Sequence, residues 1–308
     1  MFLHEDRDNF RDIIEQVVND TGKAGTVIEK DYYVTLILRL LADSLDSVVF
    51  KGGTSLSKGF HAISRFSEDI DITFSEHIGE AKRKKLKNTV IRNISETLHM
   101  PISNWDETQS DRDYNEYLFS YESVFDINDD RIPYCVKMET ALGSYSFPTE
   151  NVFIGNYIGD YLSKVDRDDL ARNFMLDSFS MQLQSINRTY IDKIFALCDY
   201  YINKKSTRYS RHLYDIKKLT PMISFDDELK SLFEEVRLHR SKMPVCPSAQ
   251  EGVNIPGLIR EFCNTDFYKQ DYQDITEYFT DDTEEYAKCI KQMMSIASWI
   301  ESIRHVSM

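Results

Sequence analysis

Apolar residues recur at helical spacing through the first 45 residues of the chain. The first series consists of Phe10, Ile13, Ile14, Val17 and Val18. Positions three and four apart share one face of a helix, so this series predicts an amphipathic helix. Two glycines within residues 21–25 interrupt the pattern. A second apolar series then predicts a helix over residues 27–45.

Short β-branched and aromatic runs follow the two helices. Residues 47–50 (Ser-Val-Val-Phe) and 70–74 (Ile-Asp-Ile-Thr-Phe) are typical of strands. Between them, the pattern predicts a Gly-rich turn and then a helix over residues 56–63. Residues 79–98 are basic and amphipathic, and predict a further helix.

The pattern turns to β structure over residues 114–146 and then to helix. Candidate strands are residues 117–121 and 134–140, and residues 147–159 are expected to form loops and short extended pieces. From about residue 168 the chain is expected to be helical to its end, apart from a loop over residues 241–257.

These elements predict an α+β fold with a small mixed sheet as its core. We expect a helical lead-in over residues 1–46, a core domain over residues 47–165 and a helical C-terminal domain over residues 166–308.

Composition is that of an ordinary globular chain, with 42% hydrophobic and 29% charged residues among 308. The longest strongly apolar run, residues 36–42, is interrupted by Arg39 and is far shorter than the roughly 20 residues of a membrane span. The N-terminus has no basic-then-apolar signal pattern. We therefore expect a cytoplasmic protein that does not act at a membrane.

The net charge of −14 argues against nucleic-acid binding by bulk attraction. Any such contact requires a local basic patch. Residues 82–92 and 204–211 are the two basic stretches, and Tyr209 in the second could stack on a base. The alternative interpretation of either stretch is a solvated helix face or loop.

A Gly-Gly-Thr-Ser turn stands between the first predicted strand and the following helix. Gly52 and Gly53 allow the backbone to approach a ligand closely. The first amides of a helix can bind a phosphate, and the hydroxyls of Thr54 and Ser55 can add hydrogen bonds. A turn of this kind taken alone is more often only a turn.

An Asp-x-Asp pair opens the second predicted strand. Asp69 and Asp71 lie two positions apart and therefore share a face of the strand. Side-by-side carboxylates repel each other unless a cation lies between them, and Mg²⁺ prefers such ligands together with waters and substrate phosphates. The pair alone is also common on exposed strands.

The two features together are far more specific than either one. Strand, Gly turn, helix and Asp-x-Asp strand would bring the phosphate-binding turn and the metal-binding carboxylates to one end of the sheet. Glu139 on a later strand is a candidate third metal ligand, or else an exposed strand residue. Such a site suits attack on a nucleotide α-phosphate with Mg²⁺ or Mn²⁺ as cofactor and an NTP as substrate.

Residues 51–56 (Lys-Gly-Gly-Thr-Ser-Leu) and 65–71 (Arg-Phe-Ser-Glu-Asp-Ile-Asp) resemble the AbiEii/AbiGii family of nucleotidyltransferase-like toxins, which includes MenT-type toxins and belongs to the DNA polymerase β-like superfamily. The resemblance covers about residues 28–220. It implies that Lys51, Gly52, Gly53, Thr54 and Ser55 bind nucleotide. Lys58 adds a cation that contacts phosphate or faces solvent.

The resemblance continues in the helical half of the chain. It implies that Lys193, in the Arg-Thr-Tyr-Ile-Asp-Lys segment, contacts a nucleotide phosphate and that Asp215, after Arg-His-Leu-Tyr, completes the active site. Without the resemblance, these would be a helix-surface Lys and an Asp in the first turn of a helix.

Three functions fit this sequence. The resemblance favours a toxin that transfers a nucleotide from an NTP to an RNA, with tRNA as the expected acceptor, and that a cognate antitoxin silences. A nucleotidyltransferase that modifies a small molecule such as an aminoglycoside would share the core and differ in its acceptor pocket. A non-catalytic nucleotide-binding module would bind NTP without turnover.

Overall fold

The computed structural model describes residues 2–65, 67, 69–125, 133–277 and 285–304. The chain forms two compact units. One contains Met1–Phe60 and Ser67–Gln184, and the other contains His61–Phe66 and Ser185–Met308.

Two helices precede the sheet of the first unit, as predicted. Helix α1 (Arg7–Thr21) begins where the Asp6 side chain accepts a hydrogen bond from the Asn9 amide, and ends at Gly22, whose φ of 71° is left-handed. Helix α2 (Gly25–Ser44) buries apolar residues on most of its circumference. A helix that is apolar all round belongs in a core rather than on a surface.

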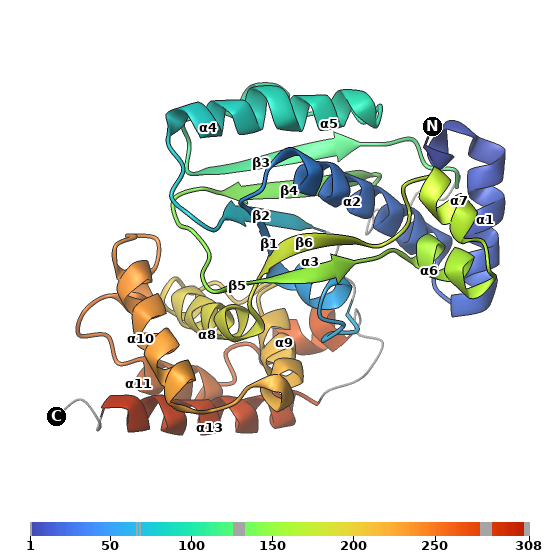
Figure 1. The fold of residues 1–308 in the computed structure, drawn as a ribbon. Helices are drawn as coiled ribbons and strands as arrows, with labels where there is room; N and C mark the ends of the chain where they lie inside the picture. The colour runs from blue at the N-terminus through green and yellow to red at the C-terminus, as the bar shows by residue number, and fades with distance from the viewer. Residues whose placement is uncertain (1, 66, 68, 126–132, 278–284, 305–308) are drawn as a thin grey trace. The chain divides into compact units, whose positions relative to one another are not determined.

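A six-stranded mixed sheet forms the centre of the first unit, in the order β3-β4-β2-β1-β6-β5 (Figure 1). The pairs β2–β4 and β1–β6 are parallel, and the other three pairs are antiparallel. The strands are β1 (Val48–Lys51), β2 (Ile70–Phe74), β3 (Tyr114–Ser120), β4 (Cys135–Ala141), β5 (Thr149–Ile154) and β6 (Phe179–Gln184).

The prediction of continuous helix after residue 168 was wrong for β6, which lies beside β1 within the sheet. Its sequence, Phe-Ser-Met-Gln-Leu-Gln, is short and half polar. The strand is nevertheless stabilised by pairing on both sides, with β1 and with β5. Partners this distant in sequence are invisible to a local pattern.

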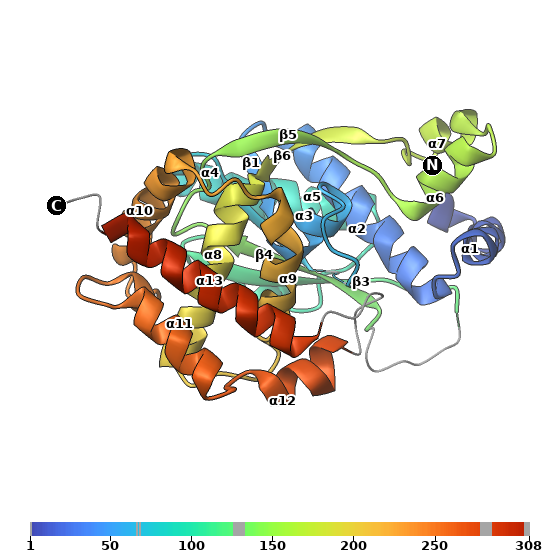
Figure 2. The same cartoon turned by 90° about the horizontal axis from the view of Figure 1, so that it is seen from below.

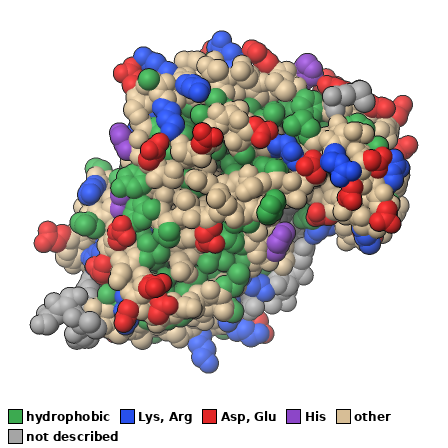
Figure 3. Space-filling view, viewed as in Figure 1, with side chains coloured by type: hydrophobic (Ala, Val, Ile, Leu, Met, Phe, Trp, Pro, Cys, Tyr) green, Lys and Arg blue, Asp and Glu red, His purple; other side chains and the backbone are tan. Residues whose placement is uncertain are grey.

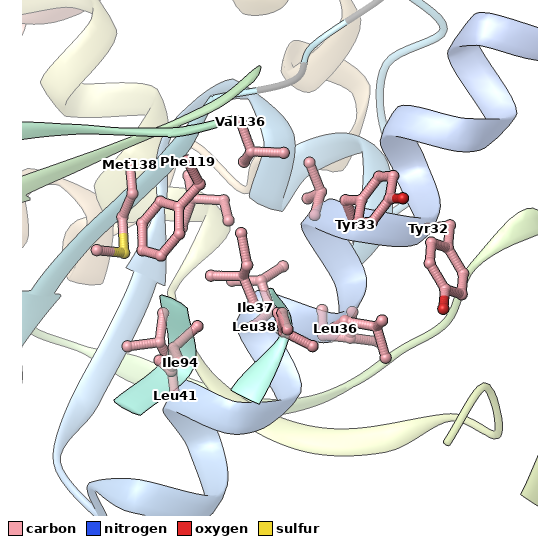
Figure 4. Close-up of a cluster of buried hydrophobic side chains, with 14 of the residues drawn as sticks. Tyr32, Tyr33, Leu36, Ile37, Leu38, Leu41, Ile94, Phe119, Val136 and Met138 are labelled. Atoms are coloured by element: carbon pink, nitrogen blue, oxygen red, sulfur yellow. The ribbon is translucent and has the colours of Figure 1, made fainter. Parts of the chain in front are cut away.

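Helix α2 and the predicted basic helix contribute to one apolar core with the sheet (Figure 4). The basic helix consists of α4 (Glu80–Lys85), a π-helical turn (Leu86–Ile91) and α5 (Arg92–Thr97). The core includes Ile37 and Leu41 of α2, Ile94 of α5, Phe119 of β3 and Met138 of β4, all at most 2% exposed. Because strand side chains alternate, the neighbouring residues of β3 and β4 lie on the opposite face.

Shorter elements complete the first unit. Helix α3 (Gly52–Lys58) follows β1 directly and contacts β1 and β2. The remaining elements are two 3₁₀ turns (Leu3–Glu5 and Trp105–Glu107), α6 (Tyr157–Lys164) and α7 (Asp168–Asn173).

The second unit is helical, as predicted. Figure 2 shows α13 running alongside α11. Stacked Phe195 and Phe233 rings, with centroids 5.1 Å apart, lie in its core, and Trp299 meets Phe233 edge-on. Its main helices are α8 (Ile186–Ile202), α9 (Arg211–Leu219), α10 (Asp227–Ser241), α11 (Ile255–Asn264), α12 (Lys269–Asp271) and α13 (Tyr286–Arg304).

The helices were compared with the length and hydropathy that a membrane-spanning helix needs. In the described part of the chain, none combines the length and the apolar character needed to cross a bilayer.

Candidate active site

The Gly turn between β1 and α3 is built against the acidic strand. Gly52 has a φ of 81°, which side-chain-bearing residues rarely adopt. A Cβ atom at Gly52 would lie only 1.9 Å from Oδ2 of Asp71. Glycine is therefore required here for two reasons, the backbone conformation and the close approach of a carboxylate.

Helix α3 begins at Gly52 itself, four residues earlier than predicted, and spans only seven residues. A helix this short has a small macrodipole. The partly exposed backbone of Gly52 and Gly53 is therefore the feature of the turn best suited to an anionic ligand.

The hydroxyl groups of the turn are directed into the protein. Thr54 and Ser55 are buried. The Thr54 hydroxyl lies 2.9 Å from that of Ser67, and the Ser55 hydroxyl donates to the Gly52 carbonyl at 2.9 Å. These bonds connect the turn to itself and to the segment that precedes Asp69. Phe66 and Glu68 of that segment lie outside the described residues.

Charged residues form one row across four strands of the sheet. Lys51 of β1 is opposite Asp71 of β2, Asp71 is opposite Glu139 of β4, and Glu139 is opposite Glu116 of β3. Directly paired residues lie on the same face. The structure thus brings Asp71 and Glu139 together at the end of β1 where the Gly turn begins.

A lysine that the sequence analysis did not identify lies within this acidic row. The Lys137 ammonium is 2.8 Å from Oε1 of Glu139, 3.1 Å from Oδ2 of Asp69 and 3.9 Å from Oε2 of Glu116. Burial lowers the pKa of Lys137, but hydrogen bonds and attraction from Glu139 and Asp69 outweigh burial and raise it. Lys137 is therefore a protonated, positively charged group among the carboxylates.

These carboxylates fit a divalent cation of the Mg²⁺ type. They are hard oxygen donors, and a cation, the Lys137 ammonium, already bridges two of them. Among the described residues, no three His, Cys, Asp or Glu side chains form a ready-made metal site. An open site, in which waters and substrate phosphates supply the other ligands, is the arrangement typical of Mg²⁺.

Lys58 does not face solvent. Its ammonium forms a salt bridge with Asp31 of α2, and both side chains are largely buried. Asp31 also accepts a hydrogen bond from the Tyr157 amide at 3.0 Å. This pair connects α3 to α2 and to the start of α6.

Lys193 and Asp215 contact each other in the second unit. The Lys193 ammonium donates to Oδ2 of Asp215 at 2.7 Å. Arg65 donates to both oxygens of the same carboxylate, at 2.6 and 2.9 Å. All three side chains are buried, so two basic groups share one carboxylate out of contact with bulk water.

Burial and pairing oppose each other in this cluster. Burial raises the pKa of Asp215, but attraction from Arg65 and Lys193 outweighs it and holds the pKa well below its usual range. Burial lowers the pKa of Lys193, and Asp215 opposes this shift. His212, 3.5 Å from Lys193, has its pKa lowered by burial and by Lys193.

The first basic stretch is largely neutralised by its surroundings. Lys82 pairs with Glu76, Arg83 with Asp113 and Lys84 with Glu80. Lys87 and Arg92 lie over the Trp105 ring. On the face drawn in Figure 3, Lys and Arg side chains are interspersed with Asp and Glu side chains.

The second basic stretch is more accessible. Lys204, Lys205, Arg208 and Arg211 are exposed. Its Tyr209 already stacks on Tyr200, with ring centroids 3.6 Å apart.

The sequence analysis missed two charged residues, one in each unit. Arg65 stands inside the Arg-Phe-Ser-Glu-Asp segment, but its partner Asp215 is 150 residues away. Lys137 stands two positions before Glu139 on the same strand face, and that spacing was a usable signal.

Comparison with known proteins gives a family match. The model of a family described as "Nucleotidyl transferase AbiEii toxin, Type IV TA system" matches residues 36–297. The chain is similar in structure to MenT4, a nucleotidyltransferase toxin from Mycobacterium tuberculosis H37Rv, with a TM-score of 0.52 and 15% identity over 94% of this chain and 89% of that one. No curated protein sequence matches the chain.

Proposed function

Because this chain belongs to the AbiEii family of nucleotidyl transferase toxins of type IV toxin–antitoxin systems, we propose that it transfers a nucleotide from an NTP to an RNA. In this proposal the NTP lies at the Gly52–Ser55 turn and a divalent metal ion is held by Asp69 and Asp71. The family confirms the predicted enzyme class, and the identity of the metal, the acceptor and the site residues is our proposal.

One observation carries the assignment of the site. Asp71 approaches the Gly52 backbone so closely that no side chain fits there. The backbone that we propose for phosphate and the carboxylate that we propose for metal thus lie side by side, as binding of a metal–triphosphate complex requires.

Each candidate site residue of the first unit has a role in this proposal. Asp69 and Asp71 hold the metal, with Glu139 as a third carboxylate beside Asp71. A bound Mg²⁺ or Mn²⁺ would neutralise phosphate charge and lower the pKa of the acceptor hydroxyl. The Gly52 and Gly53 amides hold phosphate oxygens, and Lys51, opposite Asp71, supplies a positive charge at the end of β1.

Lys193 and Asp215 have the roles that the family resemblance implies. We propose that Lys193 contacts a phosphate and that Asp215 holds Lys193 and Arg65 in position. The bidentate bond from Arg65 and the short bond from Lys193 support this positioning role for Asp215.

The acceptor in the proposal is RNA, with tRNA as the expected class. The exposed cations at Lys204, Lys205, Arg208 and Arg211 support it, because an acidic protein needs a local basic surface for RNA. The family implies a cognate antitoxin as the protein partner.

The test is transfer of label from each α-labelled NTP to total RNA in the presence of Mg²⁺. Wild type should label RNA, and Asp69→Asn and Asp71→Asn should remain folded but reduce labelling by roughly 100-fold or more. Equal labelling by the Asn variants would remove the metal assignment. An aminoglycoside mixture offered in place of RNA tests the small-molecule alternative, and NTP binding without any transfer would support the non-catalytic one.

A further inference from the structure

Lys137 is the cation at the centre of the acidic row. It projects from the polar face of β4, and its ammonium contacts Asp69, which precedes β2, and Glu139 on its own strand. Glu116 on β3 lies 3.9 Å away. A single ammonium therefore contacts carboxylates from three segments of the sheet.

Electrostatics explains why a cation belongs there. Like charges directly opposite each other on paired strands are destabilising, and Glu139 stands opposite both Asp71 and Glu116. The lysine ammonium is a compact point charge with three donors, and it can satisfy more than one carboxylate at a time. In the absence of metal, Lys137 offsets the repulsion among these groups.

Through the same contacts, Lys137 would compete with a metal ion for the carboxylates. The ammonium bonded to Asp69 uses part of the acceptor capacity of that carboxylate and repels a divalent cation that approaches it. The flexible four-carbon stem of lysine allows the ammonium to move away. Because the Lys137 side chain is 31% exposed, the ammonium can move toward solvent.

We propose that Lys137 is a positioning residue that gathers Asp69 and Glu139 before metal binds and that competes with the metal for them. The inference rests on the proposed function, because it takes Asp69 as a metal ligand. Lys137 thereby weakens binding of metal alone and makes full occupancy depend on the negative charge that the NTP brings.

The experiment compares Lys137→Met with wild type by Mn²⁺ titration, using calorimetry and the electron paramagnetic resonance signal of free Mn²⁺. We expect Mn²⁺ to bind about tenfold more tightly to Lys137→Met. Repulsion between a single and a double charge about 5 Å apart in water corresponds to roughly this change. Without metal, in EDTA, Lys137→Met should unfold at a lower temperature than wild type, and Mn²⁺ should raise its melting temperature by more.

Two further variants keep the result specific. Lys137→Arg retains the charge and should stay within about threefold of the wild-type Mn²⁺ affinity. Lys85→Met removes an exposed lysine of α4, changes the net charge equally and should leave Mn²⁺ affinity unchanged. A merely structural role for Lys137 would not tighten metal binding, so unchanged or weaker Mn²⁺ binding by Lys137→Met overturns the inference.

Failure of the proposed function would look different. If Asp69→Asn and Asp71→Asn bind Mn²⁺ as tightly as wild type, the metal site itself is misplaced and both proposals fall. If these variants lose Mn²⁺ while Lys137→Met binds it no more tightly than wild type, the metal site stands and only the role of Lys137 is refuted.

Discussion

Replacing Gly52 with alanine separates the geometry of the site from the stability of the fold. The new Cβ would lie 1.9 Å from Oδ2 of Asp71, whereas ordinary contact begins at 3.4 Å. Asp71 or the turn must therefore shift by about 1.5 Å, the difference between these distances. A misplacement of about 1 Å in a catalytic site can cost roughly 100-fold in rate, or about 2.7 kcal/mol of transition-state stabilisation.

The chain offers a matched control for backbone strain. Gly22 has a φ of 71°, close to the 81° of Gly52, but a Cβ there would meet nothing within 4 Å. The left-handed conformation should cost alanine about 1–2 kcal/mol of folding stability at either position, and Gly52→Ala adds the cost of displacing Asp71. Only Gly52→Ala should move Asp71.

The assay measures RNA labelling from α-labelled NTP together with urea unfolding for both variants. We expect Gly22→Ala to keep transfer activity within about twofold of wild type and Gly52→Ala to lose about 100-fold. Equal activity of the two alanine variants at equal stability would refute the argument that Gly52 exists to admit the Asp71 carboxylate.

Three further predictions concern side-chain contacts within each unit. Asp215→Asn should destabilise the second unit by about 3–5 kcal/mol, since it removes the buried carboxylate that Arg65 and Lys193 share. Urea unfolding at pH 7 measures this loss, and a loss below about 1 kcal/mol would contradict the prediction. The pKa of Asp215 is lower in the folded state than in the unfolded state. The stabilisation from its carboxylate is therefore present above the unfolded-state pKa of about 3.9 and is lost as the pH falls below that value. Between about pH 5 and pH 3, wild type should therefore lose more stability than Asp215→Asn. Thr54→Val and Ser67→Ala should each lower the free energy of unfolding by about 1 kcal/mol, because each breaks the hydrogen bond between the two hydroxyl groups. The double variant should lose no more than either single variant, and additive losses would show that the bond is absent.

Local sequence patterns were sufficient for the part of the fold that positions the site. The strand over residues 70–74 was predicted with the bounds observed for β2, and β1 differs from its prediction by one residue at each end. These segments have strong β-branched patterns and are consecutive strands, and consecutive strands are usually neighbours in a sheet. The start of α3 was misplaced because Gly52 and Gly53 disfavour helix in general, whereas here the approach of Asp71 requires a glycine.

The features that were missed depend on residues far apart in the chain. Strand β6 is short and half polar, and pairs with β1 across more than 100 residues. Arg65 and Asp215 are 150 residues apart, and no local pattern connects them. The spacing of Lys137 and Glu139 on one strand face was visible in the sequence, but the contact of Lys137 with Asp69 depends on the register of β4 against β2, which no local pattern shows.

The most direct test of the account is a crystal structure with Mn²⁺ and a non-hydrolysable NTP analogue, in which anomalous scattering locates the ion. We predict Mn²⁺ bonded to Asp69 and Asp71, with the triphosphate on the backbone amides of Gly52 and Gly53. A triphosphate bound away from this turn, or an ion that contacts neither aspartate, would contradict the central claim that the glycine turn and the acidic strand form one site.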